Sequence, residues 1–112
     1  RPIGQNQGIQ HPLAERWMQL EAAQLMVGKA AWLYDHGQPC GAEANAGKFL
    51  GARAGYEACL QAVLTLGGFG YAKEFHVERL WRDCRLFRFA PVSEEMILNY
   101  IAMHDLGMAR GY

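Results

Sequence analysis

Apolar residues between Pro12 and Tyr34 recur at spacings of three, four and seven, and no other feature of the chain constrains its fold as strongly. Residues three and four apart share one face of a helix, so this periodicity predicts a single long helix. Pro12 suits its first turn, where the missing N–H costs nothing, and Gly37 suits its end. Because the apolar residues form two stripes, we expect this helix to be mostly buried and central in the fold. The first stripe is Leu13, Trp17, Leu20, Val27, Ala31 and Tyr34, and the second is Met18, Leu25, Met26 and Leu33.

Three further helices follow, joined by short connections. We expect them at about Ala42–Leu66, at about Lys73–Leu86, and from near Ser93 to Gly107. Short connections between amphipathic helices are typical of an antiparallel bundle. The predicted fold is therefore all-α, an antiparallel four-helix up-and-down bundle. Strands in the stretch LTLGGFGY, residues 64–71, are the alternative for that segment.

Three glycines lie four residues apart on one strip of the second predicted helix: Gly47, Gly51 and Gly55. Each costs about 1 kcal/mol of helix propensity relative to alanine. That cost indicates that another group approaches the strip closely, most simply a neighbouring helix, with a ligand as the alternative.

Composition limits the partners that the chain can have. It has 112 residues, enough for one domain, with 51% hydrophobic residues and a formal net charge of zero. Nucleic acids and anionic membranes attract proteins with an excess of positive charge, which this chain lacks. No apolar run has the length of a membrane span. We therefore expect self-association, and neither a nucleic-acid partner nor membrane insertion.

The cysteines and histidines do not form a recognisable metal site. Cys40, Cys59 and Cys84 are odd in number and lack CxxC spacing, which indicates a reduced, intracellular protein. The four histidines are scattered, with no pair at the spacing of one helical turn. We therefore expect no bound metal ion.

Four arginines recur every third residue, with aromatic and acidic residues between them: Arg79, Arg82, Arg85 and Arg88. Arginines interleaved with aromatic residues can bind nucleic acid. A step of three, however, drifts around a helix instead of forming one stripe. We therefore predict salt bridges within the bundle and across an interface.

Two adjacent carboxylates, Glu94 and Glu95, follow Pro91 and Ser93 in the stretch RLFRFAPVSEEMIL. Ser93 suits a helix N-cap, and the helix dipole stabilises negative charge in the first turn. The dipole favours the ionised carboxylate, which is the wrong direction for a base that must accept a proton near neutral pH. Local helix structure therefore explains both residues, and they are weak catalytic candidates. An enzyme that uses Glu94 or Glu95 as its base is the rival hypothesis.

Three segments in this order resemble the C-terminal helical domain of the acyl-CoA dehydrogenases: RPIGQNQGIQHPLAE, LTLGGFGYAKEFHVERLWRDCRLFR and ILNYIAMHDLG. The resemblance covers essentially all of residues 1–112, and its specificity lies in the combination of the segments. It implies a parent protein that also has an N-terminal helical domain and a middle β-domain, both absent here. The chain opens on Arg1 rather than methionine, as we expect of a fragment or an isolated domain.

The resemblance also implies an activity. This family desaturates an acyl-CoA thioester at its α,β bond: a carboxylate removes the α-proton, and the β-hydrogen leaves as hydride to N5 of FAD. An electron-transfer flavoprotein usually reoxidises the flavin. We therefore expect FAD, an acyl-CoA substrate, an electron-transfer flavoprotein and a homo-oligomer, dimer or tetramer, in a bacterial-type cytoplasm or the mitochondrial matrix. The isolated domain should be inactive, because most of the substrate pocket lies elsewhere.

The resemblance assigns five residues to FAD binding. Gln7 matches a glutamine that contacts the flavin nucleotide, in part across the dimer interface. Gly67 and Gly68 match a glycine pair near the ADP part of a neighbouring subunit's FAD. Ser93 and Glu95 match a threonine and a Glu/Gln in a stretch that also touches FAD.

Two positions depart from the family pattern. Leu64 stands where a glutamine commonly precedes the glycine pair. Pro91 stands at the position of the catalytic glutamate of many members, and proline cannot accept a proton. Either the base lies on a helix before Arg1, which we favour, or the chain comes from a non-catalytic subunit of a mixed oligomer, or the parent has altered chemistry. The alternative function is therefore a non-catalytic helical assembly module.

Overall fold

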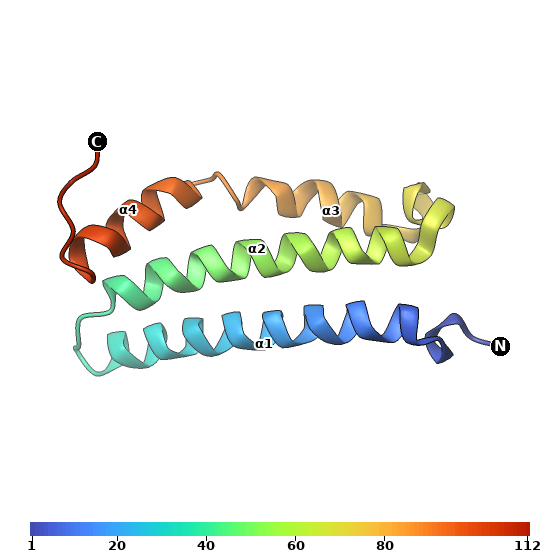
Figure 1. Cartoon of the computed structure of the whole chain (residues 1–112), viewed down its shortest axis with the longest axis horizontal. Helices are drawn as coiled ribbons and strands as arrows, with labels where there is room; N and C mark the ends of the chain where they lie inside the picture. Colours follow the sequence, from blue (N-terminus) through green and yellow to red (C-terminus); the bar gives the residue numbers. More distant parts are fainter.

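The computed structural model describes residues 1–112 and contains helices but no strands (Figure 1). Its elements, in chain order, are η1 (Ile3–Gln5), α1 (Gln7–Asp35), α2 (Gly41–Leu66), η2 (Gly67–Tyr71), η3 (Lys73–Phe75), α3 (Val77–Leu86) and α4 (Glu94–His104), where η marks a short 3-10 helix. The predicted all-α bundle of four helices is confirmed. The strand alternative for residues 64–71 is wrong, because that stretch ends α2 and forms η2.

α2 is the central helix of the bundle. α1 runs antiparallel along one side of it, and α3 and α4 follow one another along the other side, both antiparallel to α2 (Figure 1). α1 packs on neither α3 nor α4, so the molecule is elongated, with extents of 53 × 28 × 23 Å. The prediction that the first helix is central is therefore wrong, since α1 lies at an edge.

The face of α1 that packs on α2 is not the stripe with the largest apolar residues. The buried and half-buried residues of α1 recur at spacings of three, four and seven, and they are Ile9, Pro12, Arg16, Ala23, Met26, Ala30 and Leu33. Only Ala23 among them is fully buried. Its small side chain lets α1 and α2 approach closely at this point. The adjacent stripe, which contains Leu13, Trp17, Leu20, Val27 and Tyr34, is exposed, although Val27, at its border, also touches α2 at Gly47. We call these five residues the α1 stripe.

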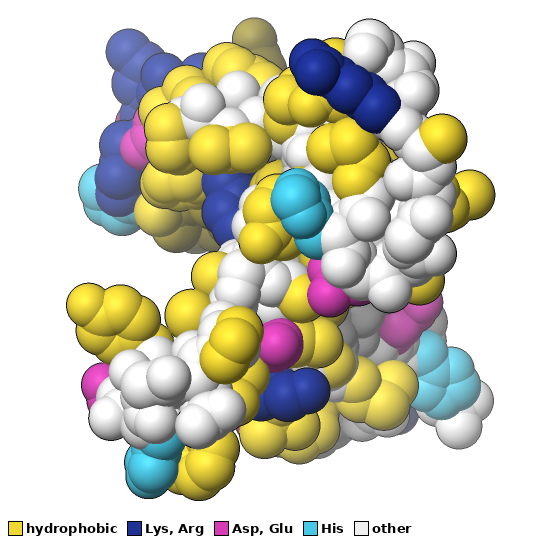
Figure 2. Space-filling view, turned by 90° about the vertical axis from the view of Figure 1, so that its left-hand side faces the viewer, with side chains coloured by type: hydrophobic (Ala, Val, Ile, Leu, Met, Phe, Trp, Pro, Cys, Tyr) yellow, Lys and Arg dark blue, Asp and Glu magenta, His cyan; other side chains and the backbone are white.

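The chain buries little of its own apolar surface. Only seven of its 112 residues are buried, and Ile97, at 1% exposure, is the single large side chain that is fully enclosed. Apolar side chains lie at the surface on both the α1 side and the opposite side of the bundle, as Figure 2 shows from the end where α1 and α4 finish. A surface of this kind is typical of a domain that other protein covers.

Two helix starts differ from the prediction. α1 begins at Gln7, before Pro12, because the carbonyl of Asn6 accepts from the N–H groups of Ile9 and Gln10 at 2.9 and 3.0 Å. Pro12 therefore lies inside the helix. The helix predicted at Lys73–Leu86 is divided at His76, whose φ of 64° is left-handed, into η3 and α3.

Other boundaries agree closely with the sequence. α2 begins one residue before the predicted Ala42 and ends at Leu66. α4 begins directly after Ser93, whose Oγ accepts from the N–H of Met96 at 3.4 Å, so the predicted N-cap is confirmed. Its last residue is His104, and Gly107 lies beyond the end with a left-handed φ of 66°.

The glycine strip of α2 is approached closely at one position only. A β-carbon on Gly47 would lie 3.0 Å from Cγ2 of Val27 in α1 and 3.4 Å from its Cα. A β-carbon on Gly51 or Gly55 would meet nothing within 4 Å. The expected neighbouring helix is thus found at Gly47, while the other two glycines border open space.

We expect Gly47→Leu to lower the free energy of unfolding by about 3 kcal/mol, because the added side chain overpacks the contact with Val27. Gly51→Leu is the matched control, and its gain in helix propensity should leave stability unchanged or raise it by up to about 1 kcal/mol. Urea unfolding followed by circular dichroism measures both. Equal effects at the two positions would contradict this account of the packing.

Candidate functional site

Glu94 lies where α2, the loop after α3 and the start of α4 meet. Arg88 donates to its carboxylate at 2.7 and 3.2 Å, and Arg53 donates at 3.3 and 3.4 Å. The side chain of Glu94 is only 10% exposed, whereas that of Arg53 is half exposed. The hydrogen bonds from Arg88, opposed by burial and reinforced by Arg53, lower the pKa of Glu94 to about 2. This carboxylate therefore stays ionised and paired at neutral pH.

Aromatic rings hold these arginines in place. The guanidinium of Arg53 lies 4.5 Å from the ring centre of Phe49, one turn earlier on α2. The guanidinium of Arg88 lies 5.1 Å from the ring centre of Tyr56, and Arg85 lies at the same distance from that ring. Cation–π contacts of this kind fix the guanidinium groups that surround Glu94.

The predicted salt bridges within the bundle are confirmed for three of the four arginines in the periodic series. Arg79 pairs with Asp83 at 3.7 Å, Arg82 pairs with Glu78 at 3.2 Å, and Arg88 pairs with Glu94. Arg85 makes no ion pair and contacts Tyr56 instead. Salt bridges across an interface between copies stay a prediction.

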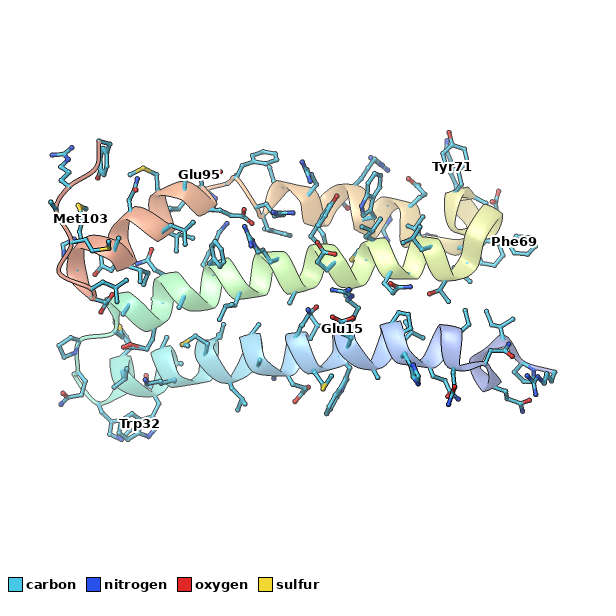
Figure 3. All side chains as sticks on the ribbon, in the orientation of Figure 1. Glu15, Trp32, Phe69, Tyr71, Glu95 and Met103 are labelled. Atoms are coloured by element: carbon cyan, nitrogen blue, oxygen red, sulfur yellow. The ribbon has the colours of Figure 1, made fainter.

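Glu95 and Pro91 have different surroundings from Glu94. The side chain of Glu95 is exposed and leaves α4 on the side away from α2 (Figure 3). Pro91 is also exposed and offers no group that could accept a proton. Glu94, held by two arginines, is a poor general base, since a base near neutral pH needs a pKa near neutrality. That neither carboxylate acts as the base stays a prediction.

A second group of candidate residues lies at the end of the long axis where α1 begins and α2 finishes (Figure 1). Gln7 is the first residue of α1, and Gly67 and Gly68 open η2 directly after α2. Gly67 has a left-handed φ of 60°, and a β-carbon on Gly68 would meet nothing within 4 Å. We call Gln7 together with η2 (Gly67–Tyr71) the end surface.

η2 is pressed against the last turns of α2. A β-carbon on Gly70 would lie 2.9 Å from Cα of Val63 and even closer to its carbonyl oxygen, so only glycine fits there. This contact fixes the turn that carries Gly67 and Gly68. Phe69 and Tyr71, in the same turn, project outward from the molecule (Figure 3) and are 66% and 88% exposed.

Sequence reasoning did not assign a role to Phe69 and Tyr71. The sequence does contain a signal for them, because an aromatic residue follows a glycine twice in GGFGY. In the short turn that these residues form, both rings are exposed. Phe75 of η3 supports one of them, because its ring centre lies 5.2 Å from that of Phe69. The end surface thus combines open backbone with exposed rings.

The five predicted FAD-binding residues fall into two separate sets. Gln7, Gly67 and Gly68 lie at the end surface, whereas Ser93 and Glu95 lie at the junction of α3 and α4 (Figure 1). The side chain of Ser93 caps α4. One copy of the chain therefore does not bring the five residues into a single pocket.

A cleft of about 530 Å³ lies between the two sets, along α1 and α2. Arg16, Arg53 and Arg88 are among its lining residues, and their charges are balanced by the nearby carboxylates of Glu57 and Glu94. No group of three or more metal-binding side chains is present. None of the helices has both the length and the hydropathy that crossing a membrane requires.

Comparison with known proteins gives consistent matches. Residues 1–106 match the family described as acyl-CoA dehydrogenase, C-terminal domain. Acyl-CoA dehydrogenase FadE12 of Mycobacterium tuberculosis is 47% identical over 113 residues, which cover 99% of this chain and 29% of that protein. The CarC subunit of the caffeyl-CoA reductase-Etf complex of Acetobacterium woodii is 42% identical over 85 residues, covering 76% of this chain and 22% of CarC.

A solved structure, an FAD complex of PigA, has the same fold. It superposes with a TM-score of 0.89 and 27% sequence identity, covering 94% of this chain and 27% of the PigA chain. The chain thus spans less than a third of the length of each of these relatives.

We expect Glu94→Gln to lower the free energy of unfolding at pH 7 by about 2 kcal/mol, because two arginines lose their anionic partner. Glu95→Gln is the matched control and should cost about 0.5 kcal/mol or less. The pKa of Glu94 is lower in the folded chain than in the unfolded one. Its contribution is therefore complete above about pH 5 and is lost as the pH falls toward about 2.

Urea titrations between pH 7 and pH 2 measure this difference. The gap between the parent and Glu94→Gln should close as the pH falls, and the gap for Glu95→Gln should stay small throughout. A gap for Glu94→Gln that is constant with pH would refute the ion-pair assignment.

Proposed function

This chain belongs to the acyl-CoA dehydrogenase family, and from that premise we propose that residues 1–112 are the C-terminal helical domain of an FAD-dependent acyl-CoA dehydrogenase-like oxidoreductase. The domain contacts FAD and joins copies of the chain into a dimer or tetramer. The substrate of the full-length protein is an acyl-CoA thioester, desaturated at its α,β bond. Its redox partner is an electron-transfer flavoprotein, and it works in a bacterial-type cytoplasm or the mitochondrial matrix.

The open glycine turn of η2 is the observation that carries the FAD proposal. Backbone without side chains lets a phosphate-bearing ligand approach closely, and Gly68 leaves that space free, whereas the N–H of Gly67 already donates to the carbonyls of Val63 and Leu64. The exposed rings of Phe69 and Tyr71 offer flat apolar surfaces beside it for the adenine. When bound, FAD accepts the hydride that leaves the substrate. The end surface therefore fits the ADP part of FAD.

Gln7 supports the same assignment. No side chain caps the start of α1, because the amide of Asn6 accepts from Arg1 and donates to the carbonyl of Ile3. The first N–H groups of α1 and the side-chain amide of Gln7 are thus available to an anionic ligand. Both lie at the end of the molecule that carries η2.

The separation of the two residue sets supports an assembly in which copies share the flavin. Ser93 and Glu95 lie at the α3–α4 junction, away from the end surface (Figure 1). A single FAD that contacts both sets does so from two copies of the chain. In this arrangement the end surface of one copy lies near the α3–α4 junction of its neighbour.

The α1 stripe supports assembly independently. Trp17, Leu20 and Val27 border a groove of about 490 Å³ whose opposite wall includes Gly51 of α2. The missing side chain at Gly51 leaves room there for a residue from another helix. This exposed apolar surface beside a small-residue notch is suited to packing against a second copy.

We infer that the base of the full-length protein comes from outside this chain, since Pro91 has no acid–base group, Glu94 is held by two arginines, and the exposed side chain of Glu95 leaves α4 on the side away from α2 (Figure 3). We place the base on a helix before Arg1. The 112-residue domain alone should show no dehydrogenase activity. Proline at position 91 also favours the second candidate function, a non-catalytic assembly subunit of a mixed oligomer, and that function predicts a full-length protein without bound FAD.

We expect Gly68→Asp in the full-length protein to raise the Kd for FAD at least tenfold, because a carboxylate at the open turn repels the diphosphate. Gly28→Asp is the matched control: a β-carbon there also meets nothing within 4 Å, and Gly28 lies on α1 away from the end surface. Flavin absorbance after dialysis and fluorescence titration measure the effect. Equal FAD content in the parent and both variants would overturn the end-surface assignment.

We expect the double variant Trp17→Glu/Leu20→Glu to shift the full-length protein toward smaller species, because charge in the α1 stripe prevents apolar burial between copies. Leu25→Glu is the matched control, since Leu25 is 75% exposed on the same helix but lies about a third of a turn away from the stripe. Sedimentation velocity gives the distribution of species. If Leu25→Glu dissociates the oligomer while Trp17→Glu/Leu20→Glu leaves it assembled, the interface does not lie at the α1 stripe.

A further inference from the structure

Cys59 of α2 and Cys84 of α3 lie side by side across the contact between the two helices. Their Sγ atoms are 3.2 Å apart, although 25 positions separate them in the sequence. Both are half-buried and unlinked. A disulfide joins its sulfurs at about 2.05 Å, so an approach of about 1 Å brings the pair to bonding distance. Side-chain rotation can supply a movement of this size.

Two glycines of α2 that no neighbouring helix approaches, Gly51 and Gly55, give access to this pair of cysteines. Cys84 lines a groove of about 230 Å³, together with Gly51, Gly55, Tyr56 and Phe87. Because Gly51 and Gly55 have no side chains and nothing fills their β-carbon positions, the wall of the groove is open at this point. A small oxidant can therefore reach the sulfur of Cys84 along α2.

We propose that Cys59 and Cys84 form a reversible dithiol–disulfide site that is oxidised by a hydroperoxide. The thiolate of Cys84 attacks the terminal oxygen of the hydroperoxide, so that an S–O bond forms, the O–O bond breaks, and Cys84 becomes a sulfenic acid. The second peroxide oxygen leaves as an alkoxide, or as hydroxide from hydrogen peroxide, and takes up a proton from water. The sulfur of Cys59 then attacks that of Cys84: the S–S bond forms, the S–O bond breaks, and the thiol proton leaves with the hydroxyl as water. Two electrons pass from the two thiols to the peroxide.

The surroundings of the two sulfurs assign different roles to them. Burial, the hydrogen bond to Cys84 and its nearby charge raise the pKa of Cys59 to about 12. Cys59 is therefore mostly a thiol at neutral pH and reacts more slowly with free peroxide than an ionised thiol would, because the thiolate is the better nucleophile; its attack on the sulfenic acid relies on the 3.2 Å between the two sulfurs. Cys84 faces the groove and reacts first, and Cys59 resolves the sulfenic acid.

Oxidation has a defined structural consequence. The disulfide closes a ring of chain from Cys59 to Cys84, which contains η2 and η3. This ring carries Gly67 and Gly68, so the site restrains the end surface when it is oxidised. The chemistry itself does not depend on FAD binding, and the test below is independent of the proposed function.

The full-length protein is treated with hydrogen peroxide, digested with trypsin without reductant and analysed by mass spectrometry. We expect the peptide Ala54–Lys73 linked to Asp83–Arg85, with the link removed by dithiothreitol. Cys40→Ser, the matched control, should give the same linked peptide. Cys59→Ser should accumulate a sulfenic acid on Cys84 that dimedone captures, and Cys84→Ser should leave Cys59 unmodified at the same dose.

Failure to detect the linked peptide in the parent protein, at a dose that oxidises other exposed thiols, would overturn the proposal. So would a link that joins Cys40 to either sulfur instead. Modification of Cys59 in the Cys84→Ser variant as fast as that of Cys84 in the parent would overturn the assignment of roles. The parent measurement needs no substitution, so a variant that fails to fold does not prevent the test.

Discussion

The structure depends on α2, because α1, α3 and α4 each pack on it and none of the three packs on another. Because the neighbouring helices lie on two sides of α2 and do not pack on one another, each helix buries only a narrow strip of its surface. The buried positions of α2 are accordingly small, Gly47, Ala52 and Ala54, which let the neighbouring helices approach. The larger apolar side chains of the chain are left at the surface, and their burial requires other protein.

This arrangement explains which parts of the fold the sequence could predict. Helix type and most helix ends follow from local patterns, so α2 and the Ser93 cap agree closely with the prediction. The position of α1 does not follow, because the periodicity argument assumes that the most apolar face points into the same chain. In α1 that face points outward, and Ala23 marks the true contact. The division at His76 was also missed, since a left-handed histidine leaves no sequence signal as clear as glycine.

The candidate site shows the same division between local and distant information. The N-cap and the first-turn position of Glu94 are visible in a few neighbouring residues. Its pairing with Arg53 joins positions 41 residues apart, and only the folded chain brings them together. The separation of Gln7 and the glycine pair from Ser93 and Glu95 likewise follows from the direction of α2, which carries the chain from one end of the molecule to the other. Motif resemblance names such residues without showing where in the fold each one lies.

The absence of packing between α3 and α4 has a consequence for the order in which the chain can fold and open. α1 and α2 meet through a tight turn at Gly37, so their pairing can proceed from nearby residues outward. α3 and α4 can then dock on α2 in either order, because neither forms part of the surface on which the other docks. Each can also detach by itself in the folded protein, so hydrogen exchange should protect α2 longest and release the two short helices as separate units.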